Sequence, residues 1–286
     1  MAVAAEHKPM QMIVLGSGSP LPDPKRAGPS TLVRTEAGDL LFDCGRGVLM
    51  RAAAAASGAG ALRGLFLTHL HSDHTTDLND VVTSRWVMSF QPSPLRVFGP
   101  PGTASLLRAT EAMLELDIGY RLAHHADLNW RPTADVVECE RGQVLAEQSV
   151  RVTAAPTDHA PVRPTVGYRV DEGGCSVVIA GDTVPCPGLD ELCAGADMLV
   201  HTVVRRDLIE PIGLPRLTDV LDYHSAVEDA ARTAARNGVG TLVLTHLVPA
   251  PQPDAEHEWA ERAAEHFDGT VVVARDLLAL DVGPGS

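Results

Sequence analysis

The hexapeptide HLHSDH at residues 69–74 places three imidazoles and one carboxylate within six positions. Imidazole and carboxylate are ligands that borderline divalent ions such as zinc prefer. In an extended turn, His69 and His71 can point to one side, while Asp73 and His74 reach a second centre. The ordinary alternative is a polar surface loop rich in histidine. Because so dense a set of ligand types directly follows an apolar run, the spacing favours a metal site.

Three further ligand-type residues each follow an apolar strand later in the chain, namely His159, Asp182 and His246. Taken singly, each has an ordinary alternative as a loop histidine, a turn aspartate or a core histidine. Side chains at strand ends on one edge of a sheet sandwich converge in space, even when they are far apart in sequence. Together with the hexapeptide they supply seven ligands, which suits two metal ions.

Two more polar residues lie beside the ends of predicted elements. Asp43 follows an apolar strand, and a buried carboxylate is costly unless it is hydrogen-bonded. It is either a turn-former or a group that orients the metal loop, and we favour the second. His224 directly precedes Ser225 and Glu228, which form an S-x-x-E capping box and predict a helix start.

Strands and helices alternate evenly along the chain, and no linker interrupts them, so a single domain over residues 1–286 is expected. Trp86 is predicted in the core, and His124-His125 on the surface rather than in a metal site. Segments 117–150 and 205–223 carry no readable motif, and a long loop at 205–222 is typical of a lid or substrate wall. Strands are predicted at 10–15, 30–35, 39–42, 62–68, 95–98, 150–155, 166–170, 176–180, 198–202, 241–245 and 270–273, and helices at 48–56, 77–90, 104–116, 189–194, 225–238 and 256–266.

Composition limits the classes of protein. Hydrophobic residues make up 45% of the 286, enough for a large core. Lys plus Arg total 23 against 37 Asp plus Glu, and the net charge of −14 opposes non-specific nucleic-acid binding. The five cysteines form no C-x-x-C pair, which is typical of reduced thiols. Since neither a signal peptide nor a transmembrane run is found, we expect a cytoplasmic protein with no membrane partner.

The ligand motifs, in their order along the chain, resemble the metallo-β-lactamase superfamily. They are HLHSDH (69–74), TDH (157–159), AGDT (180–183) and LTH (244–246). Four flanking phrases look most like the tRNase Z branch and its arylsulfatase-like relatives: LGSGSPLPDPKRAGPS (15–30), LLFDCG (40–45), GPPGT (99–103) and HSAVEDAA (224–231). The resemblance implies an α/β fold, an αββα four-layer sandwich with a dinuclear site for two zinc ions, or for Mn²⁺ or Fe²⁺, at one edge.

The resemblance also implies a role for each site residue. One zinc would be held by His69, His71 and His159. The other would be held by Asp73, His74 and His246, with Asp182 bridging the two. A hydroxide between the metals would be the nucleophile, oriented or deprotonated by Asp73.

His224 matches a family histidine that acts as proton donor or electrostatic stabiliser. Its place before a helix start favours the neutral ring unless an acid partners it.

The sequence departs from the tRNase Z pattern at two places. Where that branch has a His-Glu-Ala-Thr motif, this chain has residues 201–204 with Thr202 in place of the acid. The long tRNA-gripping arm that follows the Gly-Tyr strand in bacterial tRNase Z has no room between Val170 and Ser176. These departures and the acidic charge favour a zinc-dependent hydrolase of small-molecule esters: sulfate esters, phosphodiesters, or carboxylic esters and lactones.

Three other readings stay open. The first is a tRNA 3′-processing endonuclease that acts without the usual arm. The second is an iron-dependent oxidoreductase on the same scaffold, and the third is a metal-binding protein without catalysis. On the favoured reading nucleic acid is not expected as a partner. Because relatives in this branch are often dimers, the resemblance allows a homodimer.

Overall fold

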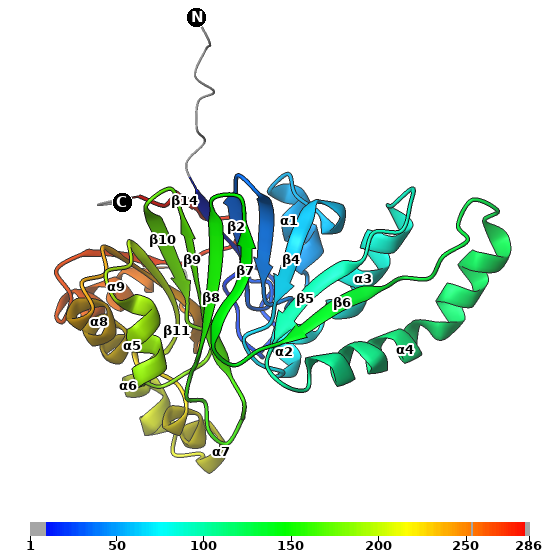
Figure 1. The fold of residues 1–286 in the computed structure, drawn as a ribbon. Helices are drawn as coiled ribbons and strands as arrows, with labels where there is room; N and C mark the ends of the chain where they lie inside the picture. Colours follow the sequence, from blue (N-terminus) through cyan, green and yellow to red (C-terminus); the bar gives the residue numbers. More distant parts are fainter. Residues whose placement is uncertain (1–9, 253, 284–286) are drawn as a thin grey trace, which may run out of the picture.

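Two mixed sheets of seven strands form the centre of the computed structural model, which describes residues 10–252 and 254–283 (Figure 1). Residues 1–9, on which the expectation of no signal peptide rests, lie outside this range. The first sheet consists, in spatial order, of β14 (Ala279–Asp281), β1 (Gln11–Gly16), β2 (Ser30–Thr35), β3 (Gly38–Phe42), β4 (Leu62–Phe66), β5 (Leu95–Gly99) and β6 (Ala134–Glu138). The second consists of β13 (Thr270–Val273), β12 (Thr241–Val248), β11 (Met198–Val204), β10 (Cys175–Ile179), β9 (Val166–Glu172), β8 (Val150–Pro156) and β7 (Gly142–Glu147).

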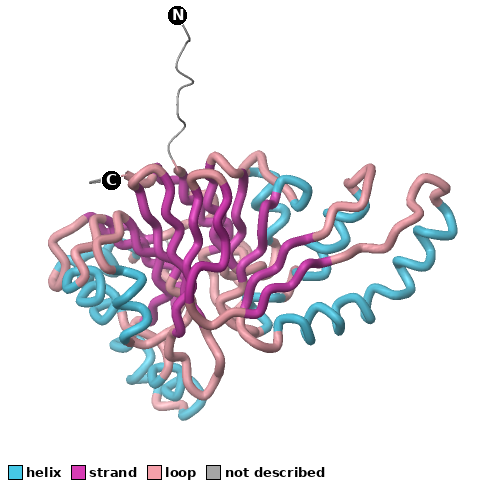
Figure 2. Tube along the Cα trace, viewed as in Figure 1, coloured by secondary structure: helices cyan, strands magenta, loops and turns pink. Residues whose placement is uncertain are grey.

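Helices cover the outer face of each sheet, so the chain forms four layers (Figure 2). The apolar contacts on the outer face of the first sheet come from α1 (Val48–Ala54), α3 (Leu78–Val87) and α4 (Thr103–His124). Those on the second sheet come from α5 (Pro187–Cys193), α8 (Val227–Arg236) and α9 (Glu256–Ala264). The predicted αββα sandwich is confirmed. The short helices are η1 (Ala59–Ala61), α2 (Ser72–Thr75), α6 (Arg206–Ile209), η2 (Glu210–Ile212), α7 (Pro215–Thr218) and η3 (Asp219–Asp222).

The core between the two sheets is apolar and partly aromatic. Phe66 stacks on Phe42 and Phe98 of the neighbouring strands, with ring centroids 4.9 and 4.6 Å apart. Tyr168 of the opposite sheet packs against this stack, and its hydroxyl donates to the carbonyl of Leu67 at 2.8 Å. Burial of such rings is the main favourable term in folding. This contact joins the two sheets directly below the first metal-ligand motif.

Parallel strands explain where the predicted ligands meet. In the first sheet β3, β4, β5 and β6 run parallel, and in the second sheet β10, β11, β12 and β13 do. The carboxyl ends of parallel strands lie at one edge of a sheet, where α/β proteins bind ligands. The polar motifs that follow β4, β8 and β10 therefore converge with β12 at one edge.

Helix α4 is longer than the helix predicted over 104–116. The predicted helix ends before Asp117 and Gly119, but in the structure the helix continues to His124. Buried residues Leu107, Thr110 and Ile118 continue one apolar stripe. Figure 1 shows this helix running outward from the sandwich. His124 and His125 are exposed at its end, so their expected place on the surface is confirmed.

The predicted capping box is shifted by one residue. Ala226, not Ser225, is the N-cap of α8, and its backbone N–H donates to the carboxylate of Asp229 at 3.1 Å. The hydroxyl of Ser225 instead donates to the carbonyl of Thr183 at 2.8 Å. The long segment after β11 was expected to be a loop, yet it is folded into α6, η2, α7 and η3.

Several other expectations concern the chain as a whole. Trp86 is buried as predicted, and the five cysteines are free thiols. Over the described residues, no helix has the length and apolarity that a membrane crossing requires. That residues 1–286 form a single domain stays a prediction.

Candidate metal centre

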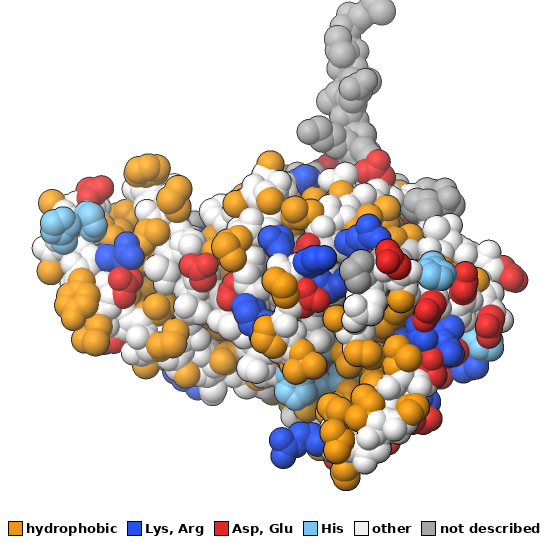
Figure 3. Space-filling view, turned by 180° about the vertical axis from the view of Figure 1, so that it is seen from behind, with side chains coloured by type: hydrophobic (Ala, Val, Ile, Leu, Met, Phe, Trp, Pro, Cys, Tyr) orange, Lys and Arg blue, Asp and Glu red, His pale blue; other side chains and the backbone are white. Residues whose placement is uncertain are grey.

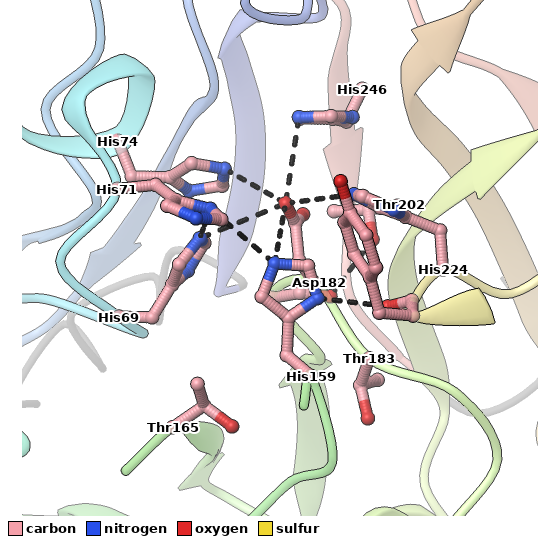
Figure 4. Close-up of polar contacts among 12 residues, drawn as sticks. His69, His71, His74, His159, Thr165, Asp182, Thr183, Thr202, His224 and His246 are labelled. Atoms are coloured by element: carbon pink, nitrogen blue, oxygen red, sulfur yellow. Dashed lines mark hydrogen bonds and ion pairs between the residues drawn. The ribbon is translucent and has the colours of Figure 1, made fainter. Parts of the chain in front are cut away.

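Asp182 lies at the middle of a buried group of histidines from both sheets (Figure 4). Its Oδ2 atom is 3.4 Å from His74 Nε2 and 3.7 Å from His69 Nε2, both delivered by the loop after β4. The same oxygen is 3.6 Å from His246 Nε2 and 3.8 Å from His159 Nε2. One carboxylate oxygen thus faces imidazole nitrogens from opposite sides.

All seven predicted ligands are brought together, in the two groups that were expected. In each group the ligand atoms lie within 4.8 Å of one another. The first group contains His69, His71, His159 and Asp182, and the second contains Asp73, His74 and His246. His224 also lies within this distance of Asp182 and His246. The arrangement offers two adjacent sites with Asp182 between them.

Asp43 hydrogen-bonds to the loop that carries the first ligand motif, which fits the orienting role expected for it. His74 Nδ1 lies 2.7 Å from Asp43 Oδ2, and the backbone N–H of Thr68 donates to Oδ1 at 2.8 Å. The Thr68 hydroxyl donates to Oδ2 at 2.8 Å and lies 3.0 Å from His69 Nδ1. Both imidazoles therefore carry their proton on Nδ1 and present Nε2 to Asp182, the arrangement usual for metal-binding histidines.

Backbone carbonyls perform the same task for two other histidines. His159 Nδ1 lies 2.8 Å from the carbonyl oxygen of Tyr223, and His224 Nδ1 lies 2.9 Å from that of Val220. Sequence reasoning missed both partners, because a backbone carbonyl is the same at every residue and leaves no signal in the side-chain sequence.

Thr202 lies beside the cluster, at the position where the tRNase Z motif has a glutamate. Having no carboxylate, it cannot serve as the acid partner of His224. Its hydroxyl donates to the carbonyl of Gly181 at 2.9 Å, which steadies the turn carrying Asp182. The acid that partners His224 is Asp182 itself, whose Oδ2 is 3.2 Å from His224 Nε2. The condition for a neutral ring at His224, the lack of an acid partner, is therefore not met.

Charge states in the cluster suit divalent metal ions. Burial lowers the pKa of His69 well below its usual value, and burial likewise lowers that of His159 to about 4. Burial alone would raise the pKa of Asp182, but the nearby His246 and His74 outweigh it, so that pKa lies well below its usual range. At His224 burial lowers the pKa, and the hydrogen bond and charge of Asp182 reverse this and raise it. His69 and His159 are therefore neutral beside the Asp182 carboxylate, and these are the forms in which such groups bind metals. His74 differs: burial alone would lower its pKa, but the charges of Asp182 and Asp43 raise it well above its usual value, so His74 would release a proton on binding a metal ion.

Three buried polar atoms of the candidate ligands lack hydrogen-bond partners among the described residues: His74 Nε2, Asp182 Oδ1 and His246 Nδ1. Leaving such groups unsatisfied costs free energy, which a bound cation would remove. The donor set, the charges and these unpaired atoms all fit a dinuclear metal site.

Comparisons with known proteins agree with this geometry. Residues 39–247 match the family described as the beta-lactamase superfamily domain. The chain is 57% identical over 275 residues to the protein named ribonuclease Z from Mycobacterium avium (strain 104), covering 96% of this chain and 98% of that protein. The chain belongs to the metallo-β-lactamase superfamily, in its ribonuclease Z branch. It is a metal-dependent hydrolase.

Further relatives cover nearly the whole chain. The ribonuclease Z of Mycobacterium tuberculosis (strain ATCC 25618 / H37Rv) is 51% identical over 277 residues, covering 96% of this chain and 99% of that protein. The structure of human tRNase Z, short form, has a TM-score of 0.71 at 23% identity and covers 96% of this chain and 100% of that one. The metallo-beta-lactamase fold protein YhfI from Bacillus subtilis gives 0.75 at 22% identity, with 96% and 99% covered. The two solved structures show the shared fold.

These relatives correct the expected substrate. Small-molecule ester hydrolysis is the wrong reading, because nearly full-length relatives at this identity are named as ribonucleases. The expectation that nucleic acid is not a partner is wrong for the same reason. A net charge of −14 describes the whole chain and does not fix the charge at one surface.

The lack of the tRNA-gripping arm does not exclude a ribonuclease, contrary to what was expected from the sequence. The absence of the arm is confirmed, since only Gly173 and Gly174 separate β9 from β10. However, the ribonuclease Z of M. avium aligns with this chain over 98% of its own length, so it has no room for a long insertion either. The lack of an arm is therefore compatible with membership of the ribonuclease Z branch.

Proposed function

We propose that this chain is a tRNA 3′-processing endonuclease that acts with two zinc ions and without the usual arm. The observation that carries the proposal is its nearly full-length identity to proteins named ribonuclease Z. In this proposal the first zinc is held by His69, His71 and His159. The second is held by Asp73, His74 and His246, and Asp182 bridges the two. A precursor-tRNA substrate is consistent with the expected cytoplasmic location, which is part of this proposal.

Zinc bound in this cluster would lower the pKa of bound water to roughly 7 and offset the charge of the scissile phosphate. Burial would raise the pKa of Asp73, but the hydrogen bond with His246, 3.3 Å away, lowers it. Asp73 is then an anion that can accept a proton from the attacking water. As the new bond to phosphorus forms, the bond to the leaving oxygen breaks, and His224 Nε2 donates its proton to that oxygen. The Val220 carbonyl keeps the other ring nitrogen of His224 occupied.

Cleavage of a precursor tRNA with a 3′ trailer tests the proposal directly. The zinc-loaded full chain should release the trailer, whereas Asp73→Ala should abolish cleavage and lower the metal content. His224→Ala should reduce turnover by about 10²–10⁴-fold, the range for loss of a general acid, with two zinc ions still bound.

The exposed His124 provides a matched control, since His124→Ala should leave cleavage unchanged. A zinc-loaded protein that leaves precursor tRNA intact would overturn the proposed function. Loss of metal in His224→Ala would instead show that His224 is a ligand.

A further inference from the structure

The two carbonyls that hold His159 and His224 come from one segment, residues 206–223, here called the helical lobe. It contains α6, η2, α7 and η3, and it connects β11 to the residues before α8. In Figure 1 it lies at the lowest part of the molecule, below the ends of the strands. His159 and His224 come from different elements, yet their rings are only 4.8 Å apart. The helical lobe therefore fixes two neighbouring imidazoles at once.

A small apolar cluster attaches the helical lobe to the sandwich. Leu221 and Ile209 are 5% and 4% exposed and pack with Val204 at the end of β11. Val220 and Val248 are partly buried against them, the latter at the end of β12. This cluster is separate from the three larger cores. The positions of the two carbonyls thus depend on a few side chains beside the strands that carry Thr202 and His246.

Leu221 has the most direct place in this cluster. It lies between Val220, whose carbonyl faces His224, and Tyr223, whose carbonyl faces His159. Its own carbonyl accepts a hydrogen bond of 3.2 Å from Arg206 Nη2 at the start of the lobe. Truncating a buried leucine leaves a cavity into which neighbouring backbone can relax.

The other large apolar side chains of the helical lobe face solvent and do not attach it. Hydrophobic side chains gather on this lowest part of the molecule in Figure 3. The exposed residues are Leu208, Ile212, Leu214 and Leu217. They differ from Leu221 in burial but not in chemistry, and so offer matched control positions.

We propose that the helical lobe is a positioning element, in which Leu221 holds the Val220 and Tyr223 carbonyls against the imidazoles of His224 and His159. The roles of these histidines as proton donor and zinc ligand rest on the proposed function. Position 202 has a threonine and no acid that could orient the His224 ring. The Val220 carbonyl fixes the orientation of that ring instead. The helical lobe thus sets both the zinc affinity of the first site, through His159, and the orientation of the proton donor His224.

The test compares Leu221→Ala with Leu217→Ala in the zinc-loaded full chain. Loss of the group that orients a metal-binding histidine lowers metal affinity by about 10–100-fold. Leu221→Ala should therefore release zinc to a chelator at about tenfold lower chelator concentration, and kcat on precursor tRNA should fall about tenfold, with KM changed less than about twofold. The Nδ1–H proton resonances of His159 and His224 should shift or exchange faster with water. Leu221→Met, which keeps a large apolar side chain, should retain wild-type zinc release, kcat and histidine resonances. Leu217→Ala should change none of these three readouts.

The readouts separate this proposal from the proposed function. Wild-type protein that leaves precursor tRNA intact, while Leu221→Ala alone alters both histidine resonances, would reject the nuclease and support the positioning role. Unchanged resonances and unchanged zinc release in Leu221→Ala would overturn the positioning role. If Leu221→Ala fails to fold, the milder Ile209→Val variant decides by the same two readouts.

Discussion

At the scale of single residues, Asp43 combines an uncommon backbone conformation with three hydrogen bonds. Its φ of +59° lies in the left-handed region, which costs a non-glycine residue about 1–3 kcal/mol. The carboxylate accepts from the Thr68 backbone, the Thr68 hydroxyl and His74 Nδ1. These bonds stabilise the strained turn and direct two imidazoles at Asp182. A single side chain thus links the end of β3 to the loop that follows β4.

Asp43→Asn is expected to weaken metal binding at the site of Asp73, His74 and His246. All three groups that face Asp43 are donors, and an amide replaces one acceptor oxygen with a further donor. Loss of such an orienting partner lowers metal affinity by about 10–100-fold, which competition with a chromogenic chelator measures.

The control for this variant is Asp39→Asn at the other end of β3. Asp39 is also buried, but it pairs with Arg34 at 3.2 Å, away from the site. Its variant should retain wild-type metal affinity. Equal metal affinity in Asp43→Asn and the wild type would show that Asp43 does not orient the ligands.

The seven candidate ligands could be predicted from sequence because their residue types have few uses when they are clustered at strand ends. Asp43 could be predicted for a similar reason, since a buried carboxylate needs partners. The Val220 and Tyr223 carbonyls could not, because every residue has one. Their role arises only when the folded chain brings residue 223 beside His159.

At the scale of elements, the turn after β3 packs backbone to backbone against the metal loop. A Cβ on Gly45 would lie 2.5 Å from the carbonyl oxygen of Asp73 and 2.5 Å from the carbonyl carbon of Gly28. Real Cβ atoms do not approach so closely, so only glycine allows this contact. The contact holds the residues before α1 against the start of α2, where the second ligand group lies.

Gly45→Ala should therefore destabilise the protein by about 1–3 kcal/mol, the usual cost of forcing extra atoms into a packed region, and should lower the metal content. Urea unfolding and metal analysis measure the two effects. Gly58→Ala is the control, because a Cβ there would meet no described atom within 4 Å. If Gly45→Ala matched this control in stability and metal content, the close packing would not position the loop.

Buried strands were easier to predict than helix ends or partly exposed strands, and the partly exposed β6, β7 and β14 were missed. Runs such as residues 242–244 of β12, the strand that contains His246, are buried on both faces and so are continuously apolar. Helix α4 is only partly covered, and its outer positions, including Tyr120, are exposed. There the sequence carries little periodic signal, and the prediction stopped eight residues early, at Leu116 instead of His124.

At the scale of the whole molecule, total charge was the wrong quantity from which to judge the substrate. Most arginines are paired with carboxylates within the protein, as Arg26 is with Glu256 and Arg51 with Asp276. The net charge of −14 therefore says little about the few Lys and Arg side chains that a bound nucleic acid would contact. The clustering of the candidate ligands is a local property, and local motifs predicted which side chains come together.

The metal centre also joins the two halves of the sandwich. His69, His71, Asp73 and His74 follow a strand of the first sheet, and the other three candidate ligands come from the second sheet. Since these groups are far apart in an unfolded chain, a metal ion held by them would bind only the folded state and would stabilise it by mass action. At a free zinc concentration 100 times the Kd this contributes about 2.7 kcal/mol per site.

Chelation should therefore lower the unfolding temperature of the whole domain in one transition, and added zinc should restore it. Asp182→Ala removes the carboxylate common to both sites, so its unfolding temperature should respond far less to chelator or zinc. The surface variant His124→Ala should respond as the wild type does. Calorimetry with and without a chelator measures these shifts. If chelation left the unfolding temperature of the wild type unchanged, metal would not hold the two sheets together.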